Sequence, residues 1–209
     1  MTHPSIAIVV SGGGSNLQAV FDAISRDILA FRVGLVLSDR PECGGIQRAI
    51  TQHVPVCAIP YPRRATPAQR MTWEQHALGV INTFAPDLVL LSGFMRILSA
   101  RTLSQLSMPV INQHPALLPN DGGEIYQLRD GRTVPALRGA HVVADALEQR
   151  LPVTGCTIHY VVPEVDRGPV IATREVPVLP SDDANTLHNR IRIAEQQLLV
   201  DTLANWSFV

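Results

Sequence analysis

Residues 110–119 read V-I-N-Q-H-P-A-L-L-P, and this stretch decides the fold that the sequence predicts. A proline and two apolar residues begin it as a buried strand. Asn112 and His114 follow two residues apart, so an extended backbone projects both side chains to the same side. Pro115 and Pro119 then stiffen the chain. The stretch therefore predicts an amide and an imidazole that project together from the end of a buried strand.

This pair of side chains suits the chemistry of a carbonyl that becomes an oxyanion. The amide N–H binds the developing charge, and the imidazole donates or moves a proton near neutral pH. Two polar residues in an ordinary loop would produce the same short pattern, so the stretch alone leaves both interpretations open. The rest of the chain has to decide between them.

Composition sets the class of protein. The chain has 209 residues, of which 46% are hydrophobic and 17% charged, so we expect one domain over residues 1–209 with a sizeable core. The formal net charge is -1 and no long Lys/Arg block occurs, which argues against partners such as nucleic acid or a membrane surface.

Cysteine and histidine usage predicts a cytoplasmic protein without a metal. The three cysteines are far apart and form no C-x-x-C, which fits a reducing compartment. The amino terminus resembles no secretory signal, and the apolar run over residues 88–98 is interrupted by Gly93 and Arg96 and too short to span a bilayer. The dispersed histidines predict no metal site.

A glycine-rich loop follows the first apolar run. Residues 6–10 read as a strand, residues 11–16 are S-G-G-G-S-N, and a helical pattern begins at Leu17. Glycines let the backbone approach a ligand, and the free N–H groups of a helix start attract anions. Ser15 and Asn16 would cap the helix or contact the anion. A tight strand-to-helix turn without a ligand is the alternative.

Strands and helices alternate up to the central stretch. Further strands are expected at 33–37, 54–59 and 87–92, and helices at 46–53, 67–84 and a short segment ending at 103–106. Five such strands predict an α/β fold with a doubly wound, mostly parallel, Rossmann-like sheet, whose ligand crevice lies at the carboxyl ends of its strands. The glycine loop and the Asn112–His114 pair both fall at such ends.

The second half departs from this alternation at residues 120–138. An inserted β-hairpin is expected over 125–137, with Asp130-Gly131 as a two-residue turn. It is either a flap over the site or a surface decoration. After it we expect a helix at 139–150, an antiparallel carboxyl-terminal extension with strands at 154–162 and 170–178, and a closing helix at 183–206.

Several single residues allow more than one interpretation. Arg70, near the start of the helix at 67–84, reads as a surface charge. The apolar loop at 93–98 is either the wall of a pocket for a flat aromatic ligand or a buried connection. His159 reads as a packed core or wall histidine, and Glu195, beside the buried stripe of the closing helix, as half-buried.

Four motifs, in a fixed order, carry a resemblance. S-G-G-G-S-N, G-F-M-R-I-L, N-Q-H-P-A-L-L-P and V-D-R-G-P-V-I together resemble the folate-dependent formyltransferases, and most closely the phosphoribosylglycinamide formyltransferases of purine biosynthesis. The resemblance runs from about residue 6 to the closing helix and is interrupted only at 120–138. It implies a single formyltransferase domain that transfers a formyl group from 10-formyltetrahydrofolate to the amine of glycinamide ribonucleotide, without a metal.

The resemblance also implies roles for particular residues. Asn112, His114 and Asp166 match the catalytic residues. The remaining matches are the phosphate loop Gly14, Ser15 and Asn16, the phosphate-contacting Arg70, the ribose-binding Glu195, and the folate-pocket residues Met95, Arg96, Ile97, Leu98 and Val165. Asn112 would donate to the oxyanion, a contribution of about 3–4 kcal/mol to the transition state. Asp166 would favour the charged form of His114 and accept the proton of the amine through water.

Departures from the family pattern lie near the expected amine substrate. The segment at 120–138 replaces a short loop, Val143 stands where a second histidine is expected, Gln113 replaces an aliphatic residue and Arg167 replaces a glycine. Two alternatives therefore stay open: formyl transfer to another amine, such as a nucleotide-linked amino sugar, and a non-catalytic folate-binding module. A homodimer is compatible with the sequence, which does not specify an oligomeric state.

Overall fold

The computed structural model describes residues 3–207, and its contacts divide the chain into two units. The first comprises Met1–Ile111 with Trp206–Val209, and the second comprises Asn112–Asn205. The boundary falls within strand β5 (Val110–His114). Seven strands are hydrogen-bonded in the order β3-β2-β1-β4-β5-β8-β9, and β6 and β7 form a separate two-stranded sheet. The predicted α/β fold with a mostly parallel sheet is confirmed.

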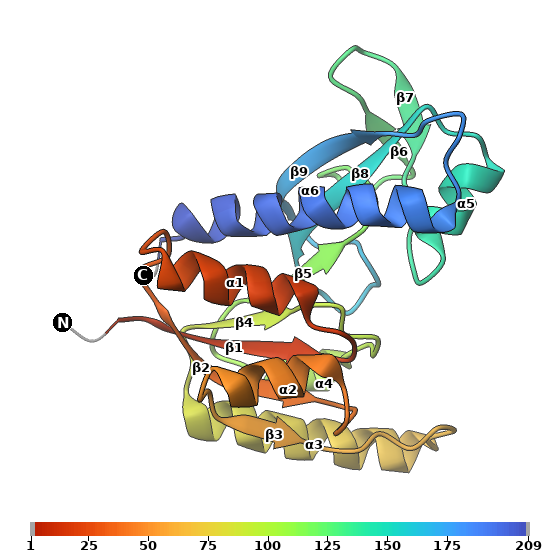
Figure 1. Cartoon of the computed structure of the whole chain (residues 1–209). Coiled ribbons are helices and arrows are strands. Elements are labelled where there is room, and N and C mark those ends of the chain that lie inside the picture. Colours follow the sequence, from red (N-terminus) through yellow and green to blue (C-terminus); the bar gives the residue numbers. More distant parts are fainter. Residues whose placement is uncertain (1–2, 208–209) are drawn as a thin grey trace. The chain divides into compact units, whose positions relative to one another are not determined.

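The first unit is an open parallel sheet with helices between its strands (Figure 1). Its elements are β1 (Ser5–Val10), α1 (Ser15–Ser25), β2 (Arg32–Ser38), α2 (Gly44–Thr51), β3 (Val56–Ala58), α3 (Pro67–Phe84), β4 (Leu88–Leu91) and α4 (Ala100–Leu103). β1 pairs in parallel with both β2 and β4, and β2 pairs in parallel with β3. Because the strand order reverses after β3, right-handed crossovers place α1 and α2 on one face and α3 and α4 on the other.

Burial on both faces explains why the strands of this unit read as continuous apolar runs. Every residue of β1 and of β4 is buried. The parallel pairing of β1 and β4 brings the loops that follow them to the same edge, where the strand order reverses. The backbone N–H of Met95 donates to Oγ of Ser11 at 3.1 Å. The glycine-rich loop and the loop at 93–98 are thus neighbours, as expected of a ligand-binding edge.

The second unit contains the antiparallel part of the fold (Figure 1). Its elements after β5 are β6 (Ile125–Gln127), β7 (Thr133–Pro135), α5 (Val142–Glu148), β8 (Val153–Tyr160), β9 (Val170–Pro177) and α6 (Ala184–Ala204). β8 and β9 pair antiparallel, and α6 packs on both of them. α6 begins with a capping box in which Asp183 and Thr186 each accept from the backbone N–H of the other.

The hairpin forms as predicted, but its turn is different. Three residues connect the strands, because the N–H of Leu128 donates to the carbonyl of Arg132, and Gly131 alone has a left-handed backbone (φ 87°). A two-residue type I′ turn needs positive φ at both residues, and Asp130 does not have it. Tyr126 Oη lies 3.0 Å from Oγ1 of Thr173, and the hairpin shares a small core that consists of Leu117, Leu128 and Val134 with Tyr126 and Val153 against it.

Three further expectations needed correction. The third strand and the helix after the hairpin are shorter than the predicted 54–59 and 139–150. The helical pattern of residues 67–84 predicts Phe84 on the buried face of α3, in phase with the buried Ala77 and Ile81, but Phe84 is the last residue of that helix and is 40% exposed. Within residues 3–207, none of the helices combines the length and the apolar character that a membrane span requires.

Candidate active site

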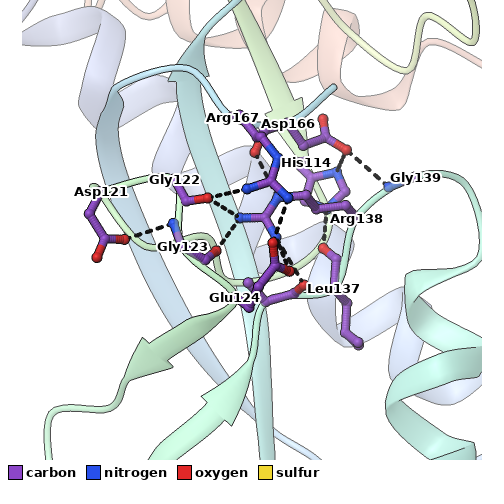
Figure 2. A network of polar contacts seen from close by, with 11 residues as sticks. His114, Asp121, Gly122, Gly123, Glu124, Leu137, Arg138, Gly139, Asp166 and Arg167 are labelled. Carbon is purple, nitrogen blue, oxygen red and sulfur yellow. Dashed lines mark hydrogen bonds and ion pairs between the residues drawn. The ribbon is translucent and has the colours of Figure 1, made fainter. Parts of the chain in front are cut away.

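Two of the predicted catalytic residues form a buried pair in the second unit. His114 is the last residue of β5, and Asp166 lies in the loop between β8 and β9. Nδ1 of His114 and Oδ2 of Asp166 are 3.4 Å apart (Figure 2). The side chains are 4% and 10% exposed, so water screens this pair only weakly.

The second ring nitrogen of His114 defines the protonation of this pair. Nε2 lies 2.8 Å from the carbonyl oxygen of Leu137, and a carbonyl only accepts hydrogen bonds, so Nε2 carries a proton (Figure 2). Any further proton on the imidazole must be on Nδ1, where it faces Asp166. Nδ1 of His114 and Oδ2 of Asp166 therefore hold at most one proton between them at physiological pH.

Near neutral pH, the surroundings of the pair favour the state in which neither atom carries that proton. Burial lowers the pKa of His114, and the neighbouring His159 and Arg138 add to this, while Asp166 and the Leu137 carbonyl act in the opposite direction and do not compensate. The sequence predicts that Asp166 favours the charged form of His114, and this effect is present. Asp166 does raise the pKa of His114, but the cost of burying the charged imidazole is larger.

Asp166 stays ionised although it is mostly buried. Burial alone would raise its pKa, but the neighbouring side chains of His159 and His114 and the N–H of Gly139 hold the pKa below its usual range. The Gly139 N–H donates to Oδ2 at 3.0 Å (Figure 2). The pair thus reaches neutral pH as a neutral imidazole beside a carboxylate.

His159 is buried, as predicted for a packed core or wall histidine, and it also joins the other groups. Its Nδ1 lies 2.9 Å from the carbonyl oxygen of Tyr160, which makes Nδ1 the donor, and its Nε2 lies 3.2 Å from Nδ2 of Asn112 and 3.6 Å from Oδ1 of Asp166. In the tautomer with its proton on Nδ1, Nε2 accepts from the Asn112 amide and fixes its orientation. No spacing in the sequence links the two, since 47 residues separate them.

The glycine-rich loop lies in the first unit and has the geometry of a close approach. Gly14 has a left-handed backbone (φ 72°) at the start of α1, and a Cβ there would stand 2.6 Å from Cα of Gly45. Ser15 and Asn16 begin α1. Among residues 3–207, Oδ1 of Asn16 is a buried atom without a hydrogen-bond partner, as is common where a ligand completes the site.

Arg70 is a partly exposed charge, as the sequence indicates, and it is also held in place by hydrogen bonds. Its Nε donates to Oε1 of Glu74 at 3.1 Å and one terminal nitrogen donates to the Ile97 carbonyl at 3.0 Å. Burial would raise the pKa of Glu74, but hydrogen bonds from Ser99, Thr102 and Arg70 lower it overall. A buried carboxylate therefore links the start of α3 to the loop at 93–98 and to α4.

The loop at 93–98 combines both interpretations that the sequence left open. Met95 and Ile97 are 55% and 53% exposed, whereas Leu98 is buried. Arg96 donates to Oδ2 of Asp39 at 2.7 Å and lies over the ring of Tyr61, 4.3 Å from its centroid. The loop thus has a fixed backbone and apolar side chains that remain accessible.

The other expected site residues lie in the second unit. Val165 is 41% exposed beside Asp166, while Glu195 is buried at 7% exposure and not half-buried as expected. Gln113 is also buried, and its side-chain nitrogen lies 3.5 Å from the Glu195 carbonyl. Nothing in residues 3–207 groups three or more His, Cys, Asp or Glu side chains where they would hold a metal ion. A groove of about 500 Å³ on α3, lined by residues such as Val80 and Phe84, contains none of the site residues.

Comparison with known proteins identifies the family. A sequence model described as formyl transferase matches residues 5–203. The chain belongs to the formyl transferase family. It is 39% identical over 199 residues to the phosphoribosylglycinamide formyltransferase of Mycobacterium tuberculosis, a match that covers 95% of this chain and 83% of that protein. It is 31% identical over 198 residues to the Escherichia coli protein of the same name, with 93% and 82% covered.

Solved structures of the formyl transferase family agree with this assignment. Glycinamide ribonucleotide transformylase 1 from Symbiobacterium toebii superimposes with a TM-score of 0.81 at 28% identity, covering 97% of this chain and 86% of that one. Glycinamide ribonucleotide transformylase 1 from Geobacillus kaustophilus superimposes with a TM-score of 0.78 at 31% identity, covering 97% of each chain. The resemblance predicted from four motifs is confirmed.

Proposed function

We propose that this formyltransferase transfers the formyl group of 10-formyltetrahydrofolate to the amine of glycinamide ribonucleotide in de novo purine biosynthesis. The observation that carries the proposal is the buried His114–Asp166 pair, whose His114 Nδ1 and Asp166 Oδ2 atoms lie 3.4 Å apart. The names of similar proteins support the same reaction. The bacterial relatives are named phosphoribosylglycinamide formyltransferase, and the human relative is named a trifunctional purine biosynthetic protein.

The reaction requires an oxyanion donor and a place for one proton. The amine attacks the formyl carbon, a carbon–nitrogen bond forms, and the formyl oxygen gains negative charge. Asn112 has two N–H donors and directs one at Nε2 of His159 at 3.2 Å, so the other is available for the oxyanion. The bond from the formyl carbon to the folate nitrogen then breaks, and that nitrogen takes up a proton.

The His114–Asp166 pair suits the transfer of that proton. Burial lowers the pKa of His114, and its polar neighbours lower the pKa of Asp166 against the effect of burial, so the pair begins without the shared proton. It accepts the proton of the attacking amine, directly or through water, as His114 becomes cationic beside Asp166. The pair returns it to the leaving folate nitrogen, and no metal is needed.

The binding roles are part of the same proposal. Gly14, Ser15, Asn16 and Arg70 bind the substrate phosphate and Glu195 binds the ribose, while Met95, Arg96, Ile97, Leu98 and Val165 bind the folate. The orphaned Asn16 Oδ1 and the oriented Arg70 support this. We also propose a cytoplasmic protein that acts as one formyltransferase domain on small molecules. Light scattering tests the homodimer that the sequence leaves open.

A rate assay tests the proposal. Purified protein with 10-formyltetrahydrofolate and glycinamide ribonucleotide should release tetrahydrofolate, and His114→Ala should lose at least about a hundredfold in rate. Folded protein without turnover would contradict the acceptor, and an amine screen that includes nucleotide-linked amino sugars then identifies the alternative. Tight folate binding with an unchanged rate in His114→Ala would instead indicate a folate-binding module.

A further inference from the structure

We propose that Arg138 is a positioning residue that links the inserted segment, residues 120–138, to the loop that carries Asp166. The insertion would then be neither a flap nor a decoration, because its base would hold the reactive carboxylate in place. The inference depends on the proposed function only in treating Asp166 as catalytic. It starts from three consecutive residues, the last two of the insertion and the glycine that follows it, each of which contacts the His114–Asp166 pair.

Those three contacts hold both members of the pair. The carbonyl of Leu137 accepts from Nε2 of His114 at 2.8 Å. Nε of Arg138 donates to the backbone carbonyl of Asp166 at 3.2 Å, and the N–H of Gly139 donates to its carboxylate at 3.0 Å (Figure 2). The end of the insertion therefore sets the positions of the imidazole, the carboxylate and the backbone between them.

Asp166 needs such support because its backbone is strained. Its φ is 54°, in the left-handed region that residues other than glycine rarely occupy. A residue in this region stays there when the surrounding contacts hold it. The hydrogen bond from Arg138 acts on the carbonyl of this same residue, so removing it allows the peptide to relax and the carboxylate to move.

Arg138 is itself held by a full set of acceptors. A guanidinium has five N–H donors, and five acceptors lie in reach. Besides the Asp166 carbonyl they are Oε2 of Glu124 at 3.1 Å and the carbonyls of Ala136, Gly122 and Gly123 (Figure 2). The side chain is 13% exposed. Four of these acceptors lie near the two ends of the insertion, so the planar guanidinium of Arg138 connects those ends. The same hydrogen bonds fix the orientation of the guanidinium.

Arg167 supports the same connection from the opposite side. Its guanidinium donates to the Gly122 carbonyl and to Oε1 of Glu124, so both arginines share these two partners (Figure 2). The family pattern has a glycine at this position and a short loop in place of residues 120–138. The two departures thus complement each other, because the additional arginine beside Asp166 binds the additional segment.

A matched pair of arginine variants tests the proposal. Arg138→Met removes the fork, and Arg132→Met, its control, removes an arginine of the same insertion that pairs with Asp130 at the exposed tip. We expect kcat to fall about tenfold to hundredfold in Arg138→Met, with each KM changed by less than about threefold, because a small displacement of a reactive group has effects of that size. Arg132→Met should keep the unsubstituted kcat.

Arg138→Lys separates geometry from charge. Lysine keeps the charge but has three donors on one nitrogen, which do not reproduce the planar fork, so we expect no rescue of kcat. It also serves as the variant for all measurements if Arg138→Met does not fold. The proposal would be overturned if the kcat of the Arg138 variant stayed within twofold of that of the unsubstituted protein, or if its loss equalled that of Arg132→Met.

The amide of Gly139 reports on Asp166 without any turnover. The Gly139 N–H donates a hydrogen bond to the carboxylate of Asp166. NMR of the unsubstituted protein should therefore show slow exchange of this amide proton with solvent and a downfield shift. We expect both to diminish in Arg138→Met and to persist in Arg132→Met. An unchanged Gly139 signal would refute the positioning role even if the acceptor amine differed from the proposed one, which keeps the two proposals separable.

Discussion

Replacing Asp166 with asparagine removes the negative charge of the pair while keeping the volume of the side chain. The carboxylate lies 3.4 Å from Nδ1 of His114, so its attraction for a cationic imidazole amounts to about 5 kcal/mol at an effective dielectric constant of about 20. That energy corresponds to between about three and four powers of ten in rate if all of it acts in the transition state. Since nearby dipoles compensate in part, we expect Asp166→Asn to lower kcat at least about a hundredfold.

Single-turnover kinetics with both substrates saturating measures this effect on the chemical step. The control is Asp130→Asn, which removes a carboxylate that is half exposed and pairs with Arg132 at the tip of the hairpin. Its rate should equal that of the unsubstituted protein, because an exposed ion pair has a small effect even on stability. If Asp166→Asn kept more than about a tenth of the rate, the shared-proton mechanism would be refuted.

Three further outcomes are expected. Burial lowers the pKa of His114 in the folded protein, so the unfolded chain binds more protons once the pH falls below the ordinary value of 6.5. The melting temperature should therefore fall as the pH drops below 6.5, and it should fall less steeply in His114→Gln. Gly168→Ala places a Cβ 1.7 Å from the Tyr160 carbonyl oxygen, so calorimetry should show destabilisation of more than about 2 kcal/mol. Glu74→Leu removes the carboxylate that accepts from the hydroxyls of Ser99 and Thr102, and circular dichroism should show a loss of about 2–4 kcal/mol in the free energy of unfolding. An unchanged melting temperature would contradict the importance of these hydrogen bonds.

Local sequence signals predicted the elements of the first unit because both faces of its strands are buried. The residues of β1 are all buried, so a continuous apolar run was a sufficient signal. The start of α3 was equally local, since Thr66 and Gln69 form a capping box around Pro67. The errors occurred at the ends of the sheet and of the helix: β3 pairs with β2 at the end of the strand order, and Phe84 is the last residue of α3.

The sequence predicted the common direction of Asn112 and His114 but not the contacts around them. Asn112 and His114 are two residues apart on one strand, so their common direction follows from the backbone alone. His159 was missed because its role depends on hydrogen bonds to Asn112 and Tyr160 that no local pattern encodes. The effect of Asp166 on the pKa of His114 was predicted correctly, but the larger and opposite effect of burial depends on the folded surroundings.

The order of strands and helices, the glycine-rich loop and the family could be predicted from the sequence, because each depends on short motifs and on their order along the chain. The tertiary structure alone decided the protonation of the His114–Asp166 pair and the role of Arg138. Burial and the Leu137 carbonyl set the first, and acceptors from both ends of the insertion set the second. Both depend on the dielectric surroundings and on hydrogen bonds between distant residues, which exist only once the chain has folded.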